Sequence, residues 1–287
     1  LSTAFESAFS TGDTISEFNI KSHGYMVSAG HQHTCAIDDI GVKCWGNNGW
    51  GQTSVPSLVN PTWVSAGNRH TCAIDDNGSK CWGSNEFGQG SFYANASSNP
   101  TLVTAGYYHT CILQDHLQLG GKGVYCQGWG NYGQDVVPSL SNPTWVSAGQ
   151  EHTCALDDTG VKCWGRNDYG QINVPSLSNP TQVSLGYSHS CALDSEGVKC
   201  WGRNDLGQSE VPSLSNPTQV SAALTHTCAI DSSGVKCWGH NYDGETDVPS
   251  LVNPTWVSAG WRHTCAVDDT GVKCWGTNVD AQSEAPN

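Results

Sequence analysis

The sequence has little positive charge: 12 Lys and Arg stand against 26 Asp and Glu, which gives a net charge of −14. A surface of this sign repels phosphate backbones and anionic headgroups, so we expect no nucleic-acid partner. Apolar runs long enough to cross a bilayer are also missing, so we expect no membrane insertion. The chain starts at Leu1 without a charged segment followed by an apolar one, and we interpret it as a processed, mature product.

The sequence also lacks the short motifs that mark common active sites. It contains no Gly-x-Ser-x-Gly elbow, no His-Glu-x-x-His helix and no phosphate-binding glycine loop. We therefore expect no catalytic residue, no metal and no cofactor, and keep a catalytic propeller only as an alternative.

What the sequence does contain is a unit repeated seven times, whose first copy reads HTCAIDDIGVKCWGNNGWGQ over residues 33–52. A β-rich run such as residues 62–66 comes first, followed by Gly and two residues that differ in every copy. The strand His-Thr-Cys-Ala, an Asp-rich turn and the return strand Val-Lys-Cys-Trp-Gly come next. A variable loop ending in Gly-Gln, then Val-Pro-Ser-Leu and Asn-Pro-Thr, leads onward. The copies begin at His33, His70, His109, His152, His189, His226 and His263.

Four short strands in about 37 residues, repeated seven times without an amphipathic helix, predict an all-β, seven-bladed propeller over residues 21–287. An open β-solenoid is the alternative. Closure is favoured because residues 281–286 copy the GQSEVP segment that elsewhere precedes the next blade, and can complete the ring beside residues 25–30. Residues 1–20 match no repeat and form an N-terminal arm outside the propeller.

The 14 cysteines fall into one pair per repeat, six of them spaced C-x8-C and the third with six extra residues. This pattern predicts intra-blade disulfides and an oxidising compartment, hence an extracellular or cell-surface protein. Metal ligation is the alternative, since a His lies two residues before each first cysteine. The predicted bridges are Cys35–Cys44, Cys72–Cys81, Cys111–Cys126, Cys154–Cys163, Cys191–Cys200, Cys228–Cys237 and Cys265–Cys274.

The runs Gly-Gln-x-x-Val-Pro, Val-Ser-Ala-Gly-x-x-His-Thr-Cys-Ala and Gly-Val-Lys-Cys-Trp-Gly-x-Asn resemble the repeat of the regulator of chromosome condensation superfamily. The resemblance covers residues 21–287 and is closest to the bacterial branch that includes the propeller-type β-lactamase inhibitory protein. It implies a seven-bladed propeller with a protein-binding or scaffold role. Paired cysteines and acidity argue against a nuclear exchange factor, and no residue identifies a β-lactamase as partner.

Residues that recur in every blade are expected to serve the fold. We interpret the repeated His as hydrogen-bonded to the neighbouring loop, and the repeated Trp as packing between blades, with Gln127 in its place in the third repeat. Asp pairs at the hairpin tips, such as Asp38-Asp39 and Asp157-Asp158, could ligate calcium. Turn chemistry explains them better, because adjacent carboxylates lack the alternating pattern of a calcium loop.

The positions that do not repeat are the candidates for function. Strands alternate in direction, so the Gly-x-x-His loops and the loops ending in Gly-Gln should emerge on one face. There an arc of aromatic residues, with Arg166 and Arg203 among them, has the composition of a protein-binding hot spot or a sugar-stacking platform. The alternative is drift of exposed loops. The candidate binding residues are Trp50, Arg69, Phe87, Tyr107, Tyr108, Trp129, Tyr132, Tyr169, Tyr187, Trp261 and Arg262.

Two hypotheses for function follow. The first is a secreted propeller that binds a protein or a glycan through this face. The second is a structural subunit of an extracellular homopolymer, in which the N-terminal arm with Phe5 and Phe9 docks on a neighbouring copy. The sequons at Asn77 and Asn95 permit N-glycosylation on the opposite side, where the Asp turns and Pro connections lie.

Overall fold

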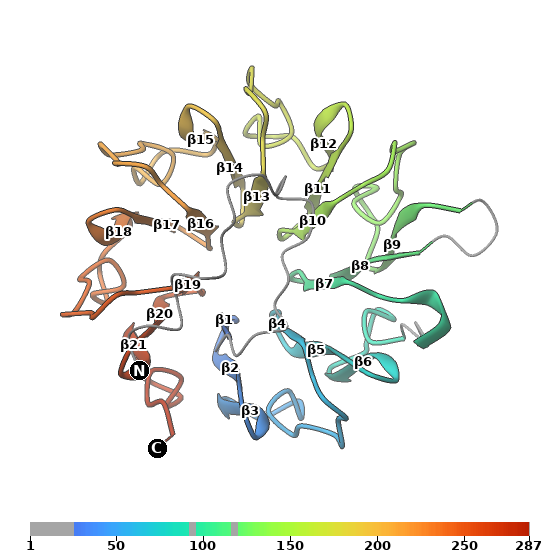
Figure 1. The fold of residues 1–287 in the computed structure, drawn as a ribbon, viewed down its shortest axis with the longest axis horizontal. Helices are drawn as coiled ribbons and strands as arrows, with labels where there is room; N and C mark the ends of the chain where they lie inside the picture. Colours follow the sequence, from blue (N-terminus) through green and yellow to red (C-terminus); the bar gives the residue numbers. More distant parts are fainter. Residues whose placement is uncertain (1–25, 92–95, 116–119, 287) are drawn as a thin grey trace, which may run out of the picture.

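The computed structural model describes residues 26–91, 96–115 and 120–286. It shows seven antiparallel three-stranded sheets arranged as blades around one axis (Figure 1). In blade 1, β1 (Met26–Ala29) lies innermost, β2 (His33–Asp38) lies next and β3 (Gly41–Gly46) lies outermost. The predicted all-β, seven-bladed propeller is confirmed. The predicted N-terminal arm lies outside the described residues and stays a prediction, as does its role in assembly.

The other six blades repeat this order. Their strands are β4 (Trp63–Ala66), β5 (His70–Asp75), β6 (Gly78–Gly83), β7 (Leu102–Ala105), β8 (His109–Asp115), β9 (Lys122–Gly128), β10 (Trp145–Ala148), β11 (His152–Asp157), β12 (Gly160–Gly165), β13 (Gln182–Leu185), β14 (His189–Asp194), β15 (Gly197–Gly202), β16 (Gln219–Ala222), β17 (His226–Asp231), β18 (Gly234–Gly239), β19 (Trp256–Ala259), β20 (His263–Asp268) and β21 (Gly271–Gly276). One 3-10 turn, η1 (Ala96–Ser98), precedes blade 3. None of the described segments is a helix long and apolar enough to span a membrane.

Each blade has three strands, so the expectation of four was wrong. The segment between blades 1 and 2, residues 53–62, contains no strand. Pro56 and Pro61 lack an N–H to donate, and Asn60 adopts the left-handed conformation with φ 48°, which interrupts an extended chain. Asn99, Asn142, Asn179, Asn216 and Asn253 repeat this geometry before the later prolines. Among the described residues, no further strand pairs with the outermost strand of any blade.

The hairpin register is the predicted one. Cys35 lies opposite Cys44 and Ile37 opposite Val42, which leaves Asp39 and Ile40 at the tip. Disulfides join all seven predicted pairs, including Cys111 with Cys126 in the longer third hairpin. The register is fixed twice over, because both the turn and the bridge specify it. The metal alternative loses its thiolate ligands, since the sulfurs are bonded to each other.

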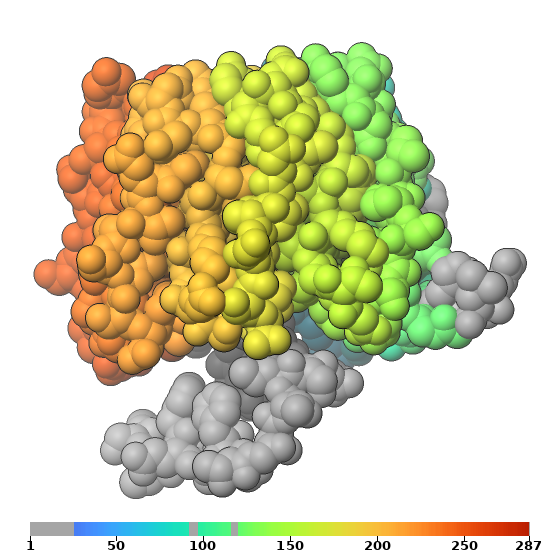
Figure 2. Space-filling model, turned by 90° about the horizontal axis from the view of Figure 1, so that it is seen from above, coloured from blue at the N-terminus to red at the C-terminus, as the bar shows by residue number. Residues whose placement is uncertain are grey.

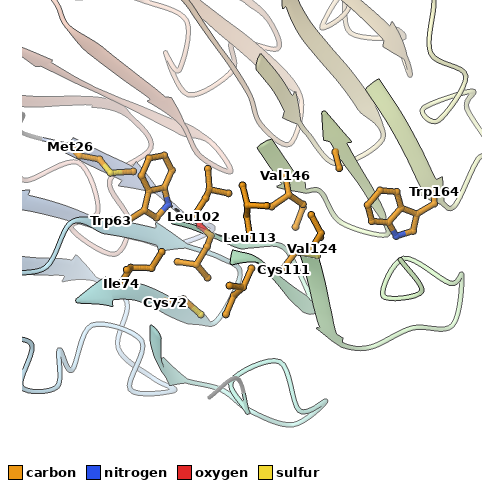
Figure 3. Close-up of a cluster of buried hydrophobic side chains, with 14 residues drawn as sticks. Met26, Trp63, Cys72, Ile74, Leu102, Cys111, Leu113, Val124, Val146 and Trp164 are labelled. Carbon is orange, nitrogen blue, oxygen red and sulfur yellow. Dashed lines mark hydrogen bonds between the residues drawn. The ribbon is translucent and has the colours of Figure 1, made fainter. Parts of the chain in front are cut away.

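The hydrophobic core lies between blades and is shared by neighbours. The largest cluster contains Met26 of blade 1, Trp63 of blade 2, Leu113 of blade 3 and Val146 of blade 4 (Figure 3). Figure 2 shows from the side how adjacent blades pack against one another. A single blade could not bury these side chains, so each blade depends on its neighbours for stability.

A buried hydroxyl links each pair of neighbouring blades. Thr71 Oγ1 of blade 2 lies 2.8 Å from His33 Nε2 of blade 1 and donates to the Gln52 carbonyl, also at 2.8 Å. Because the hydroxyl has one proton and gives it to that carbonyl, the Nε2 of His33 must carry the proton and donate. The other six histidines make the same contact with Thr110, Thr153, Ser190, Thr227, Thr264 and Thr34.

The repeated histidine is structural, as expected, but its partner differs from the expectation. It bonds a strand hydroxyl of the next blade, and that hydroxyl in turn bonds the loop. The Gln52 carbonyl also accepts from Trp82 Nε1 at 2.9 Å, so the repeated tryptophan clamps the same loop. Trp45, Trp164, Trp201, Trp238 and Trp275 make the equivalent bond.

The same contacts close the ring. His263 Nε2 lies 2.8 Å from Thr34 Oγ1, and the Gln282 carbonyl accepts from both Thr34 and Trp45. The end of the repeat region therefore completes blade 1, as predicted. It lies against β2 and β3 and not beside the innermost strand.

In the six blades other than the third, the first aspartate of the hairpin tip is committed to the fold. In blade 2, Asp75 accepts hydrogen bonds from Lys80 and from the backbone N–H groups of Val59 and Asn77. Burial alone would raise the pKa of Asp75, but these donors hold it below its usual value. The second aspartate, Asp76, accepts from the Asn60 amide. These bonds explain the Asp pairs without calcium.

Acid should destabilise the propeller through the seven repeated histidines. Burial lowers the pKa of His33 to about 3 and that of His70 to about 4, from the ordinary 6.5. The unfolded chain takes up protons below pH 6.5 while the folded chain does not, so stability is complete above pH 6.5 and falls toward pH 4. Each such histidine should cost about 2 kcal/mol of unfolding free energy between pH 7 and pH 5.

Urea unfolding without reductant at pH 7, 6 and 5 measures this loss. The window separates histidines from carboxylates, whose contributions disappear only as the pH approaches their ordinary pKa of 3.8. An unfolding free energy that stays level from pH 7 to pH 5 would contradict the buried, neutral state of these imidazoles.

Removing one linking hydroxyl should destabilise one blade junction. Thr227→Val leaves the Nε2–H of His189 buried without an acceptor, while the Gln208 carbonyl keeps its bond from Trp238. We expect a loss of about 1–3 kcal/mol beyond the effect of shape. Thr227→Ser is the matched control and should cost about 1 kcal/mol for the lost methyl group, because Ser190 already performs this role in blade 5. Equal unfolding midpoints for the two variants would refute the role of the hydroxyl.

Candidate functional site

Two sets of variable residues meet on one face of the propeller. The first residue after the repeated Gly lies at the mouth of the central channel in each blade, and we call this set the inner ring. The loops that follow the outermost strands place a second set farther from the axis, the outer ring. The inner ring consists of His31, Asn68, Tyr107, Gln150, Tyr187, Leu224 and Trp261. The outer ring includes Trp50, Phe87, Tyr132, Tyr169 and Leu206, which are all exposed.

Inner-ring side chains touch across the channel. The His31 ring stacks on Trp261 with centroids 3.8 Å apart. Tyr107 packs edge-on against His31 at 5.6 Å and against Tyr187 at 6.2 Å. Four blades thus contribute to one continuous aromatic contact, because long side chains reach inward where the innermost strands converge.

The contact extends outward over blades 2 to 4. Tyr107 packs against Tyr108 at 4.5 Å, and Tyr108 packs against both Phe87 and Trp129 at 5.3 Å. Trp129 then meets Tyr132 at 5.8 Å. We call the eight rings from Trp261 to Tyr132 the aromatic network. Edge-to-face geometry of this kind adds stability beyond the burial of area and holds the rings in place.

Four arginines lie over aromatic rings on the same face. The guanidinium carbon of Arg69 lies 4.8 Å from the Trp50 ring centre, and that of Arg262 lies 4.8 Å from the ring of Trp261. Arg166 covers Tyr132 and Arg203 covers Tyr169 in the same way. Such cation–π contacts stiffen long side chains that would otherwise be mobile.

The charges of these arginines are balanced to different degrees. Arg166 pairs with Glu151 and Asp168, and these hydrogen bonds raise its pKa. Arg203 pairs with Asp205. Arg69 has no ion pair within the part of the chain that the structure describes, so its charge is available to a ligand.

Burial keeps the centre of the face neutral. It lowers the pKa of His31 to about 4, assisted by the positive charges of Arg69 and Arg262, so His31 is uncharged at pH 7. Burial and the neighbouring Tyr108 and Tyr187 raise the pKa of Tyr107 to about 12. The mouth of the channel therefore carries no titrating charge near neutral pH.

Three tryptophans narrow the opposite end of the channel. Trp63 packs edge-on against Trp145 and Trp256, both at 6.1 Å, and the surrounding cavity has a volume of about 140 Å³. The Trp63 indole donates to the Val103 carbonyl of the next blade at 2.8 Å (Figure 3). These tryptophans serve as a plug and belong to the core. The exposed hairpin tip at Asn77 lies on this side, and Asn95 lies outside the described residues.

The structure brings most of the predicted binding residues together. Eight of the eleven, Phe87, Tyr107, Tyr108, Trp129, Tyr132, Tyr187, Trp261 and Arg262, are members of the aromatic network or lie directly on it. Trp50 with Arg69 forms a separate pair near the network, and Tyr169 contacts Arg203.

Sequence reasoning left out several residues of this face. The first variable position of each repeat holds Tyr107 in blade 3, and the same position holds His31, Asn68 and Gln150 in blades 1, 2 and 4. Their shared position in the repeat could have identified them. In blade 6, Glu245 replaces the usual glutamine and His240 accompanies it; His240 Nδ1 lies within hydrogen-bond distance of the buried Glu245 carboxylate. The paired change at two loop positions was visible in the sequence but went unused.

The fold and the site define a disulfide-stapled, seven-bladed β-propeller with one variable, aromatic face. The model of the regulator of chromosome condensation (RCC1) repeat matches residues 64–89, 146–171, 181–208 and 257–282. Four of the seven blades therefore carry the RCC1 repeat, which confirms the resemblance that the motifs implied. The narrower resemblance to the β-lactamase inhibitory branch stays a prediction.

Solved structures of similar fold include plant and yeast proteins. The ectodomain of the Physcomitrella patens receptor kinase CR4 matches with a TM-score of 0.72 and 22% identity, over 88% of this chain and 72% of that one. The CRINKLY WD40 ectodomain of the Arabidopsis thaliana receptor kinase ACR4 gives 0.72 and 23%, over 90% and 96%. Prp20p of Saccharomyces cerevisiae, studied for binding to Gsp1p and histones, gives 0.52 and 17%, over 91% and 74%. No curated protein sequence matches the chain. These likenesses establish the fold.

His31 should titrate near pH 4 in the folded protein, and Trp261→Ala should raise its pKa toward 6.5, because the variant exposes one face of the imidazole to water. A proton NMR titration of the imidazole Cε1–H measures both values. Tyr242→Ala, a change on the same face that contacts only His240 among the rings, is the control and should leave the His31 value unchanged. A Trp261→Ala value that stays near 4 would contradict the stacked, buried placement.

Proposed function

We propose that this chain is a non-catalytic binding propeller that recognises a protein or glycan ligand through the face formed by the inner and outer rings. The observation that carries the proposal is the aromatic network itself. Exposed and half-buried rings in one continuous contact, with arginines stacked on them, are the composition of binding hot spots. Isolated apolar side chains on a surface are ordinary, whereas a connected group of them is not.

The residues that stabilise the propeller are not the residues that form the face. The histidines, hydroxyls and tryptophans that hold the blades together are buried and repeat, whereas the face is built from positions that change from blade to blade. Substitutions on the face can therefore alter recognition at little cost in stability.

An extracellular location follows from the same proposal. Seven disulfides are stable in an oxidising compartment and would be reduced in a cytosol. The two plant receptor ectodomains are examples of this fold outside the cell. The protein partners of Prp20p show that a propeller of this repeat type can serve as a docking surface in another setting.

A binding screen with matched variants tests the proposal. The labelled wild-type protein is applied to arrays of glycans and of extracellular protein domains, beside Trp129→Ala, Tyr132→Ala and the control Tyr242→Ala. Trp129 lies at the centre of the outer part of the network, so its loss should weaken capture about tenfold or more. Tyr242 is 88% exposed on the same face but outside the network, and its variant should bind normally. Ligands that bind all four proteins equally would refute recognition through this face.

A further inference from the structure

The mouth of the channel forms an open cavity of about 210 Å³ whose wall has three kinds of side chain. Tyr107, Tyr187 and Trp261 supply aromatic surface, Asn68 and Gln150 supply amides, and Leu224 supplies an aliphatic side. Backbone of the repeated Ala-Gly segments forms the base. The volume suits one small cyclic ligand or the end of a longer chain.

The two amides are the unusual feature of this cavity. Asn68 is 7% exposed and Gln150 is 8% exposed, and neither amide bonds another group within residues 26–91, 96–115 and 120–286. Neither residue has a polar side-chain atom sealed away from solvent without a partner, so both amides open onto the cavity. Each amide can therefore donate to and accept from a ligand that enters there.

The chemistry of that ligand follows from the charge of the wall. The residues that line the cavity include no Asp, Glu, Lys or Arg, and His31 is neutral at pH 7. A charged ligand would lose hydration there without gaining a counter-charge. Amides that donate and accept, set beside flat aromatic surface, complement a molecule with hydroxyl groups at its edge and C–H groups on its faces.

We propose that this cavity binds one uncharged sugar ring, the end of a neutral glycan, with Asn68 and Gln150 bonding its hydroxyl groups against Tyr107, Tyr187 and Trp261. The inference rests on the proposed function and narrows the ligand from protein or glycan to glycan. The outer ring then contacts the following sugar units, and Arg69 lies at the rim.

The first test uses the wild-type protein, so that no variant needs to fold. Glucose, galactose, mannose and N-acetylglucosamine, with their short oligomers, are titrated into 15N-labelled protein. At least one should shift the Trp261 indole N–H signal while leaving those of Trp63, Trp145 and Trp256 at the plugged end unchanged. Binding confined to sulfated sugars or uronic acids, or no shift with any neutral sugar, would overturn the proposal.

Variants then assign the contacts. Asn68→Leu and Gln150→Met each remove one amide and keep a side chain of similar volume. Each variant should bind the neutral sugar about tenfold more weakly, as measured by calorimetry. Unfolding midpoints at or above that of the wild type should accompany this loss, since the amides make no bonds within the described protein. Undiminished affinity in both variants would refute their role.

The outer ring separates this inference from the proposed function. Tyr132→Ala should leave binding of a single sugar ring unchanged and weaken only longer glycans. Suppose that no neutral sugar binds, and that a protein ligand is captured less well by Trp129→Ala but normally by Asn68→Leu and Gln150→Met. That result would overturn the sugar site and support the binding face. If no ligand on the arrays binds more weakly to Trp129→Ala or Tyr132→Ala than to the wild type, the proposed function itself is contradicted.

Discussion

A hydroxyl shared between neighbouring blades is the contact on which this structure depends. It accepts from the histidine of the preceding blade and donates to the carbonyl of the loop that follows that blade, as Thr71 does between His33 and Gln52. All three groups are removed from water, so each needs its partner. The histidine–hydroxyl bond fixes blade orientation at all seven junctions, and the ring closes because His263 and Gln282 meet Thr34 in the same way.

This contact explains which residues repeat. The histidine and the hydroxyl recur because every junction uses them, and the tryptophan recurs in six of the seven blades because it holds the same loop. The small residue before the variable pair recurs for a steric reason. A Cβ at Gly149 would lie 2.7 Å from the Gly186 carbonyl of the next blade. Residues that line the channel mouth or lie in the outer loops make none of these contacts between blades. They are therefore free to differ, and the aromatic network is assembled from them.

Much of the fold could be predicted from the sequence because its determinants are local. The register of Cys35 with Cys44 follows from turn length and a bridge, and seven copies of a hairpin predict seven blades. The fourth strand was predicted wrongly, because the effect of Asn60 and the prolines on the backbone outweighed the β-rich composition. The partner of the histidine was also misplaced, since it lies in another blade some 38 residues away.

The site was predictable in composition but not in shape. The variable columns identified Tyr107, Trp129 and Trp261 as candidates, since they are aromatic where other copies are not. Whether Tyr107 reaches both His31 and Tyr187 depends on the radius of the ring, which no local pattern specifies. Asn68 and Gln150 belong to the same variable positions but were not chosen as binding residues, because an amide on an exposed loop is ordinary and only the cavity makes it unusual.

The central claim is that the repeated histidines are neutral structural donors and that recognition belongs to the residues that do not repeat. A 15N NMR spectrum of histidine-labelled protein tests it most directly. The account predicts seven imidazoles with a protonated Nε2 and a bare Nδ1, whose nitrogen shifts stay constant from pH 8 to pH 5. Repeated histidines that titrate near pH 6.5, or that carry the proton on Nδ1, would contradict it.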